Sequence, residues 1–104
     1  ALIDAPVSGG GHSAANRTLT VMVGGEEAVV KKVRPILETY AGLIVHLGGV
    51  GAGQHAKLIN NAMMAANMAV AHHGLATATA LGVDRSALIE LVKVSSGRSY
   101  GFEV

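Results

Sequence analysis

A long stretch without formally charged residues most constrains how this chain can fold. Residues 58–83 contain no Asp, Glu, Lys or Arg, and a helix of that length could cross a bilayer. Asparagine, histidine and threonine recur along the stretch, however, and such frequent polar side chains would be costly in lipid. We therefore predict a long helix over residues 51–81 that is buried among protein neighbours. Gly82 should end this helix, and Asp84 should cap a further helix over residues 85–94.

The first half of the chain has a mixed pattern. Apolar or alternating runs predict strands over residues 1–7, 18–23 and 43–47. Glu26 opens a helix between the last two strands, and Pro35 should break or kink that helix. Near its midpoint the chain therefore changes from mixed strand and helix to helix only, which indicates an α/β part followed by an all-α part.

Composition narrows the class of protein. Half of the 104 residues are hydrophobic and 14% are charged, which is typical of one globular domain. The formal charge of +1 gives no field that would attract nucleic acid or a membrane surface, so we expect neither as a partner. The absence of cysteine excludes a disulfide framework and fits a cytoplasmic protein. The five histidines have no carboxylate at ligand spacing, so we expect no metal site.

A glycine-rich turn at residues 48–53 stands between a predicted strand and the long helix. A dinucleotide-binding loop has this context, but its Gly-x-Gly-x-x-Gly spacing is absent, because Gly49 and Gly51 are followed by Gly53. No strand ending in an acidic residue follows either. We expect these glycines to let the start of the helix approach another backbone closely.

The most distinctive chemical group lies at the start of the predicted long helix. Asn60 and Asn61 follow Lys57 by three and four residues, so one helix face carries an ammonium and two carboxamides. Met64 and Met68 continue that face as apolar side chains. Such a setting suits a lysine to general acid–base catalysis. An equally weighted alternative is a lysine that extends its charge into solvent, beside two asparagines bonded to one another.

A second candidate site follows the first predicted strand. Ser8, Gly9 and Gly10 form a turn whose backbone N–H groups no side chain shields, and the serine hydroxyl adds another donor. Such a turn can hold a carboxylate or phosphate oxygen. Taken alone, an ordinary turn between strand and loop is the favoured interpretation.

Two motifs together resemble the β-hydroxyacid dehydrogenase family. Residues 4–10 read DAPVSGG and residues 18–25 read TLTVMVGG, as in that family. Residues 51–61, with the pattern Gly-x-Gly-x-x-x-Lys-x-x-Asn-Asn, resemble its catalytic segment, and residues 95–99 look like part of its helical domain. The nearest subgroup is 3-hydroxyisobutyrate dehydrogenase and tartronate semialdehyde reductase, with 6-phosphogluconate dehydrogenase more distant. The resemblance covers essentially the whole chain.

The resemblance implies a fold and an activity. Residues 1–49 would be the C-terminal strands of an NAD(P)-binding Rossmann-type domain, and residues 50–104 the long interdomain helix and the start of an all-α domain. The activity would be the NAD- or NADP-dependent interconversion of a short 3-hydroxy acid and its semialdehyde.

The resemblance also implies roles for single residues. Lys57 would exchange the proton of the reacting hydroxyl, and Ser8, Gly9 and Gly10 would hold the substrate carboxylate. Asn61 would orient the substrate, with Asn60 as a weaker candidate. No residue is assigned to the cofactor, because the family's glycine-rich cofactor loop is expected upstream of this segment.

Further expectations concern the chain as a piece of a longer enzyme. We expect it to be inactive alone, to expose apolar surface along residues 58–81, and to form a homo-oligomer through its helical part. Arg17 replaces a glycine usual in the family and leaves the loop shape and substrate choice open. One alternative is a non-catalytic helical assembly module in which Lys57 is incidental. Another is a glyoxylate or succinic semialdehyde reductase, which Gly10 disfavours mildly because such reductases often carry serine there.

Overall fold

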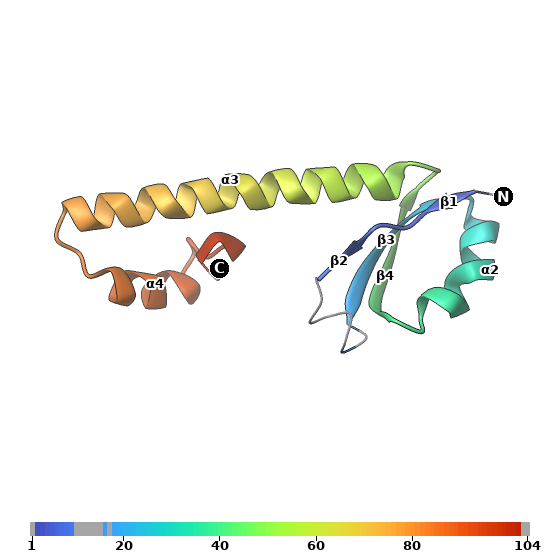
Figure 1. Ribbon diagram of the computed structural model, residues 1–104, viewed down its shortest axis with the longest axis horizontal. Coiled ribbons are helices and arrows are strands. Elements are labelled where there is room, and N and C mark those ends of the chain that lie inside the picture. Colours follow the sequence, from blue (N-terminus) through green and yellow to red (C-terminus); the bar gives the residue numbers. More distant parts are fainter. Residues whose placement is uncertain (1, 10–15, 17, 103–104) are drawn as a thin grey trace. The chain divides into compact units, whose positions relative to one another are not determined.

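The computed structural model describes residues 2–9, 16 and 18–102 (Figure 1). The chain divides into two compact units, residues 1–59 and residues 60–104. The boundary falls within one long helix, α3 (Ala52–Ala80), so each unit contains part of it. The first unit is α/β and the second is helical, as the sequence pattern predicts.

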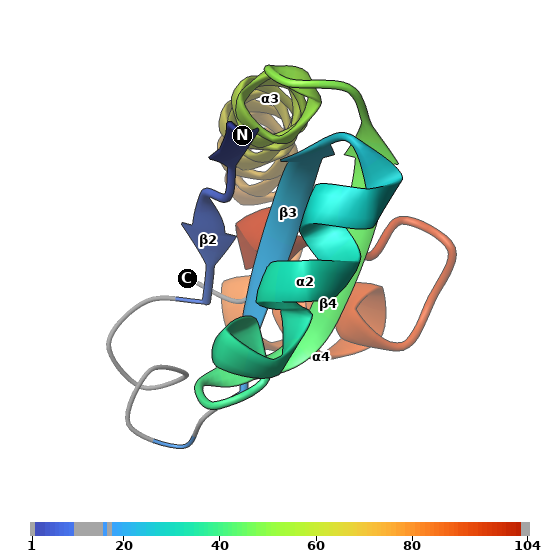
Figure 2. The same cartoon turned by 90° about the vertical axis from the view of Figure 1, so that its right-hand side faces the viewer.

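The first unit is built on a small mixed sheet whose central strand is β3. Its elements are β1 (Ile3–Asp4), β2 (Val7–Ser8), β3 (Leu19–Gly25), α2 (Glu27–Leu37) and β4 (Ala41–Gly48). Strands β1 and β2 pair antiparallel with successive parts of β3, and β4 pairs with β3 in parallel. Helix α2 makes the crossover from β3 to β4 and covers one face of these two strands (Figure 2).

The core of this unit lies between β3 and α2. Val21 and Val23 are fully buried in β3, and they pack with Val30 and Leu37 of α2. β-branched residues suit a strand that is covered on both sides, because the stiff side chains lose little freedom there. The core therefore fixes β3 firmly, and β3 is the strand against which the candidate site is built.

The first predicted strand is interrupted. Instead of one strand over residues 1–7, the structure has β1 and β2, separated by Ala5 and Pro6. Proline has no N–H to donate to a strand ladder. Its carbonyl still accepts a hydrogen bond of 2.9 Å from the N–H of Met22, so the segment stays against β3 across the interruption.

Of the predicted break or kink at Pro35, the break is wrong. Helix α2 runs continuously through Pro35 to Leu37. Proline so near the C-terminal end removes only one helical N–H, and the carbonyl that it leaves, on Lys31, belongs to an exposed residue. Burial of Leu37 against the core holds the last turn in place.

The helical unit begins within α3 and confirms both predicted caps. Gly82 has φ +77°, and the N–H groups of Gly82 and Val83 donate to Thr79 and Ala78, the bonding of a Schellman C-cap. The Asp84 carboxylate accepts a bond of 2.9 Å from the Ala87 N–H and caps α4 (Arg85–Lys93). A short 3-10 helix, η1 (Tyr100–Phe102), follows the predicted loop and was not expected.

Helix α3 was predicted to be buried among protein neighbours, but it is buried on only part of its surface. Ala71, Leu75 and Ala78 are buried, whereas Met63 and Val70 are 60% and 69% exposed. The part of the helical unit that the structure describes offers only α4 and η1 as partners. The expected exposure of apolar surface along residues 58–81 is thereby confirmed. Within the described ranges, no helix is long and apolar enough to span a membrane.

Candidate active site

The start of α3 is brought against β3 by glycine. Strand β4 leads into a turn in which Gly48 and Gly51 have φ +145° and +98°, values that favour glycine. A β-carbon on Gly53 would lie 2.2 Å from the carbonyl oxygen of Met22 in β3. The predicted close backbone approach is confirmed at Gly53, whereas a β-carbon on Gly49 or Gly51 would meet nothing within 4 Å. The contact at Gly53 sets where the first turns of α3 lie.

A carboxylate that sequence reasoning did not single out also holds this turn. One oxygen of Asp4 accepts a hydrogen bond from the N–H of Gly51 and the other from the N–H of Gln54, each at 2.7 Å. The bond from Gly51 is the largest cause that lowers the pKa of Asp4 below its usual value, with desolvation acting in the opposite sense. The sequence held no local signal for this contact, because the partners are 47 and 50 residues away.

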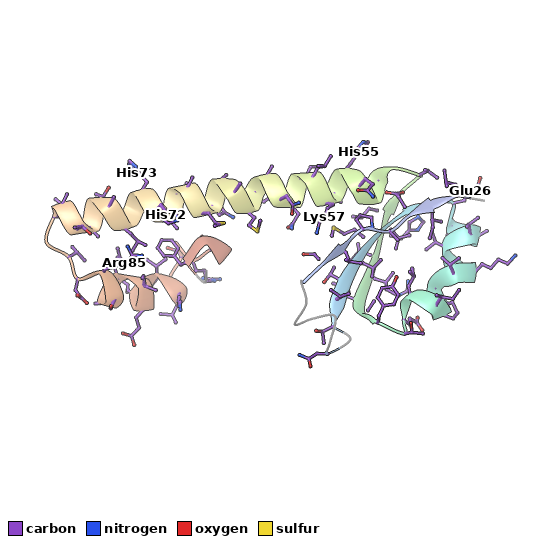
Figure 3. All side chains as sticks on the ribbon, in the orientation of Figure 1. Glu26, His55, Lys57, His72, His73 and Arg85 are labelled. Atoms are coloured by element: carbon purple, nitrogen blue, oxygen red, sulfur yellow. The ribbon has the colours of Figure 1, made fainter. Side chains whose placement is uncertain are left out.

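Lys57 reaches the turn predicted to hold an anion. It projects from α3 (Figure 3), is half-buried, and donates a hydrogen bond from its ammonium to the carbonyl of Val7. Ser8, the next residue, is half-buried in β2 and pairs with Thr20 of β3. Gly9 has φ +127°, a conformation that a residue with a side chain rarely adopts. The structure therefore places the Lys57 ammonium against Val7, which directly precedes Ser8 and Gly9 in the chain.

The other predicted site residues are placed less fully. Gly10 and Arg17 lie outside the described residues. Asn60 and Asn61 continue α3 three and four positions after Lys57, and both are exposed. Their spacing puts them on the same side of the helix as Lys57.

This arrangement suits two chemical tasks. The ammonium of Lys57 gives positive charge and exchangeable protons beside a turn with a hydroxyl at Ser8, so an anionic group can be held and a proton can be moved at one place. Among the described residues, no cluster of His, Asp or Glu could hold a metal ion. A hollow of about 490 Å³ lined by Leu2, Glu26, Val29 and Val50 contains none of the candidate residues.

The glycine-rich turn before α3 does not fit the pyrophosphate of a dinucleotide. Phosphate binding at a helix start needs free N–H groups and no competing negative charge. Here the Asp4 carboxylate already accepts from the N–H groups of Gly51 and Gln54. The described residues therefore provide no phosphate cradle at this turn.

Two family models together match nearly the whole chain. Residues 1–49 match a family model described as the NAD binding domain of 6-phosphogluconate dehydrogenase. Residues 51–103 match one described as NAD-binding of NADP-dependent 3-hydroxyisobutyrate dehydrogenase. Both models contain residues of the candidate site, Ser8 and Gly9 in the first and Lys57 in the second.

Individual relatives are similar over nearly the whole chain. The chain is 42% identical to a 2-(hydroxymethyl)glutarate dehydrogenase of Eubacterium barkeri, covering 97% of this chain and 34% of that protein. It is also 42% identical to an NAD-dependent L-serine dehydrogenase of Pseudomonas aeruginosa, covering 100% of this chain and 35% of the relative. The chain thus spans about a third of the length of these relatives.

A solved structure has the same fold. The 3-hydroxyisobutyrate dehydrogenase of Mycobacterium tuberculosis with L-serine superposes with a TM-score of 0.88 at 39% identity. The match covers 95% of this chain and 34% of that one.

Proposed function

The chain belongs to the β-hydroxyacid dehydrogenase family, and we propose that it supplies the substrate-anchoring and proton-transfer part of an NAD- or NADP-dependent enzyme. The reaction is the interconversion of a short 3-hydroxy acid and its semialdehyde. In this proposal residues 1–49 end a Rossmann-type domain, and residues 50–104 begin the all-α domain. The observation that carries the proposal is the hydrogen bond from Lys57 to Val7, which puts the ammonium next to the Ser8 turn.

The names of the relatives support the substrate class. 3-Hydroxyisobutyrate, 2-(hydroxymethyl)glutarate and L-serine share one unit. In each, a primary alcohol carbon and a carboxylate are attached to the same carbon atom. An enzyme for this unit must hold an anion and exchange the proton of a nearby hydroxyl. The Ser8 turn and Lys57 offer these two functions side by side.

Each residue then has a defined role. Ser8, Gly9 and Gly10 bind the substrate carboxylate. In the oxidising direction Lys57, as the neutral amine, takes the hydroxyl proton, and the carbon gives up a hydride as the carbon–oxygen bond becomes a carbonyl. In the reducing direction the ammonium returns the proton to the oxygen as the carbon regains a hydride. Asn61 orients the reacting oxygen by hydrogen bonding, and Asn60 is a weaker candidate for the same role.

When bound, the nicotinamide cofactor would take up this hydride in the oxidising direction and give it back in the reducing direction. We assign none of the described residues to it; in the turn before α3, Asp4 already accepts from the N–H groups of Gly51 and Gln54. We also propose that the chain alone is inactive and that the full-length protein is a homo-oligomer.

The decisive experiment replaces Lys57 in the full-length protein. Lys57→Met keeps the length of the side chain and removes its proton chemistry, so kcat should fall by about 10²–10⁴-fold. Lys32→Met, at an exposed position of α2, is the matched control and should leave kcat unchanged. Turnover is followed as reduction of NAD or NADP with 3-hydroxyisobutyrate, L-serine and 2-(hydroxymethyl)glutarate.

The outcomes separate the proposal from its rivals. Unchanged turnover in Lys57→Met, with native circular dichroism, removes Lys57 from catalysis. Lack of turnover on every hydroxy acid by the unaltered protein favours a helical assembly module. Turnover confined to glyoxylate or succinic semialdehyde keeps the proton role but changes the substrate class.

A further inference from the structure

The Asp4 carboxylate lies where three backbone segments converge. It belongs to β1 and bonds to two N–H groups at the start of α3. A β-carbon on Gly24 of β3 would lie 2.4 Å from one of its oxygens, and a β-carbon on Gly53 would lie 2.9 Å from the other. Side chains at either position would therefore displace the carboxylate. The glycines leave room for a single acidic side chain between two strands and a helix.

Two bonds from one carboxylate fix the helix more tightly than one bond would. The N–H groups of Gly51 and Gln54 are three residues apart and span the first turn of α3. Each residue of an α-helix advances about 1.5 Å along the axis and turns by about 100°. A helix that slipped by one residue would lose both bonds and rotate every side chain away from its position.

The same short segment also receives Lys57. Lys57 follows Gly53 by four residues, so both lie on the side of α3 that faces the first unit's strands. Its ammonium bonds to the carbonyl of Val7, three residues after Asp4. Residues 4–7 therefore hold α3 at two points, the first turn and the ammonium.

We propose that Asp4 is a positioning residue, whose carboxylate sets the axial position and rotation of α3 so that Lys57 meets the Ser8 turn. This inference rests on the proposed proton-transfer role of Lys57. It differs from ordinary capping, because the capping group comes from the segment that the lysine must reach. Strand β1 and the site turn are then tied to the first turns of α3.

The test compares two aspartates that cap helices in the full-length protein. Asp4→Asn keeps the size of the side chain but replaces one acceptor oxygen with an NH2 group, which cannot accept from an N–H. Asp84→Asn makes the same change at the local cap of α4 and is the matched control. Asp4→Asn should lower kcat by about 10–100-fold with little change in KM, since a displacement of about 1 Å can cost that much. Asp84→Asn should leave kcat within about twofold.

A double variant distinguishes positioning from loss of folded protein. If Asp4 acts through Lys57, then Asp4→Asn added to Lys57→Met should lower kcat no further than Lys57→Met alone. A merely structural effect would lower kcat by the same factor in both backgrounds and would overturn the inference. So would a kcat for Asp4→Asn equal to that of Asp84→Asn.

The controls keep the two proposals apart. Full turnover in Lys57→Met would overturn both the proposed function and the inference. Loss of turnover in Lys57→Met together with normal turnover in Asp4→Asn would overturn the inference alone. If Asp4→Asn does not fold, Asp4→Ser replaces it, because serine is a good capping residue that can accept one of the two bonds. The same kcat comparison then decides.

Discussion

Gly53 of α3 stands directly against the Met22 carbonyl of β3, at a distance that leaves no room for a side chain. A β-carbon there would lie 2.2 Å from the carbonyl oxygen. Backbone atoms cannot move aside as the end of a flexible side chain can. The contact between these two residues therefore requires glycine, and it seats the helix that carries Lys57.

The substitution Gly53→Ala should destabilise the protein. Overpacking of this kind typically costs about 1–3 kcal/mol, since the helix start must move away from β3. Gly74→Ala is the control in the same helix, where a β-carbon meets nothing within 4 Å. That change should stabilise by about 0.5–1 kcal/mol, because alanine favours the helix over glycine. Urea unfolding of the full-length protein measures both; equal effects would refute the close contact.

The Asp4 carboxylate should make stability depend on pH in one direction. Its pKa is lower in the folded protein than in the unfolded chain, chiefly through the bond from Gly51. Its contribution is then present above the unfolded-state pKa and is lost as the pH falls through the folded-state pKa. We expect the Tm difference between the native protein and Asp4→Asn to be constant near neutral pH and to shrink on strong acidification. A difference that grows in acid would contradict this sign.

Local chemistry explains which elements could be predicted from the sequence. The hydrogen bonds of the caps at Gly82 and Asp84 join groups within five residues of each other, so both caps can be predicted without tertiary structure. The spacing of Lys57, Asn60 and Asn61 is likewise a property of one helix. The family motif added what spacing alone left open, namely that Lys57 belongs beside the Ser8 turn.

Contacts between distant segments explain what the sequence could not show. The partners of Asp4 are 47 and 50 residues away, and no periodicity reports such a contact. Pro35 was expected to break its helix because propensity favours a break. Burial of Val30 and Leu37 on either side of it outweighs the loss of one hydrogen bond.

Ser8→Ala should weaken binding of the substrate carboxylate. A hydrogen bond to a charged group contributes about 1.5–3 kcal/mol, which corresponds to a rise in KM of about 10–150-fold. kcat should change less, because the proton carrier is Lys57. Ser96→Ala, at an exposed loop position after α4, is the control and should leave KM unchanged. The methyl ester of the substrate carries no carboxylate charge. With this ester, Ser8→Ala and the native protein should have the same KM if the serine binds the charged carboxylate.

The 104-residue chain by itself should show no turnover. It contains Lys57 and the Ser8 turn but spans only about a third of the length of its relatives, and Asp4 occupies the turn before α3. Reduction of NAD or NADP is measured at equal molar concentrations of the chain and the full-length protein, with circular dichroism to verify that the chain is helical. Detectable turnover by the folded chain would show that it holds a cofactor without further segments.

The exposed apolar side chains of α3 should make the isolated chain associate. Leu58, Met63 and Val70 are each at least 60% exposed, and burial of one such side chain stabilises by about 1.5–3 kcal/mol. Light scattering over a range of concentrations should show a dimer or larger species. Val70→Glu should shift the equilibrium toward monomer, because association would bury its charge without a partner. Val94→Glu, at a valine that is 82% exposed outside α3, is the control and should leave the equilibrium unchanged. A native chain that stays monomeric at every concentration would show that this surface does not drive self-association.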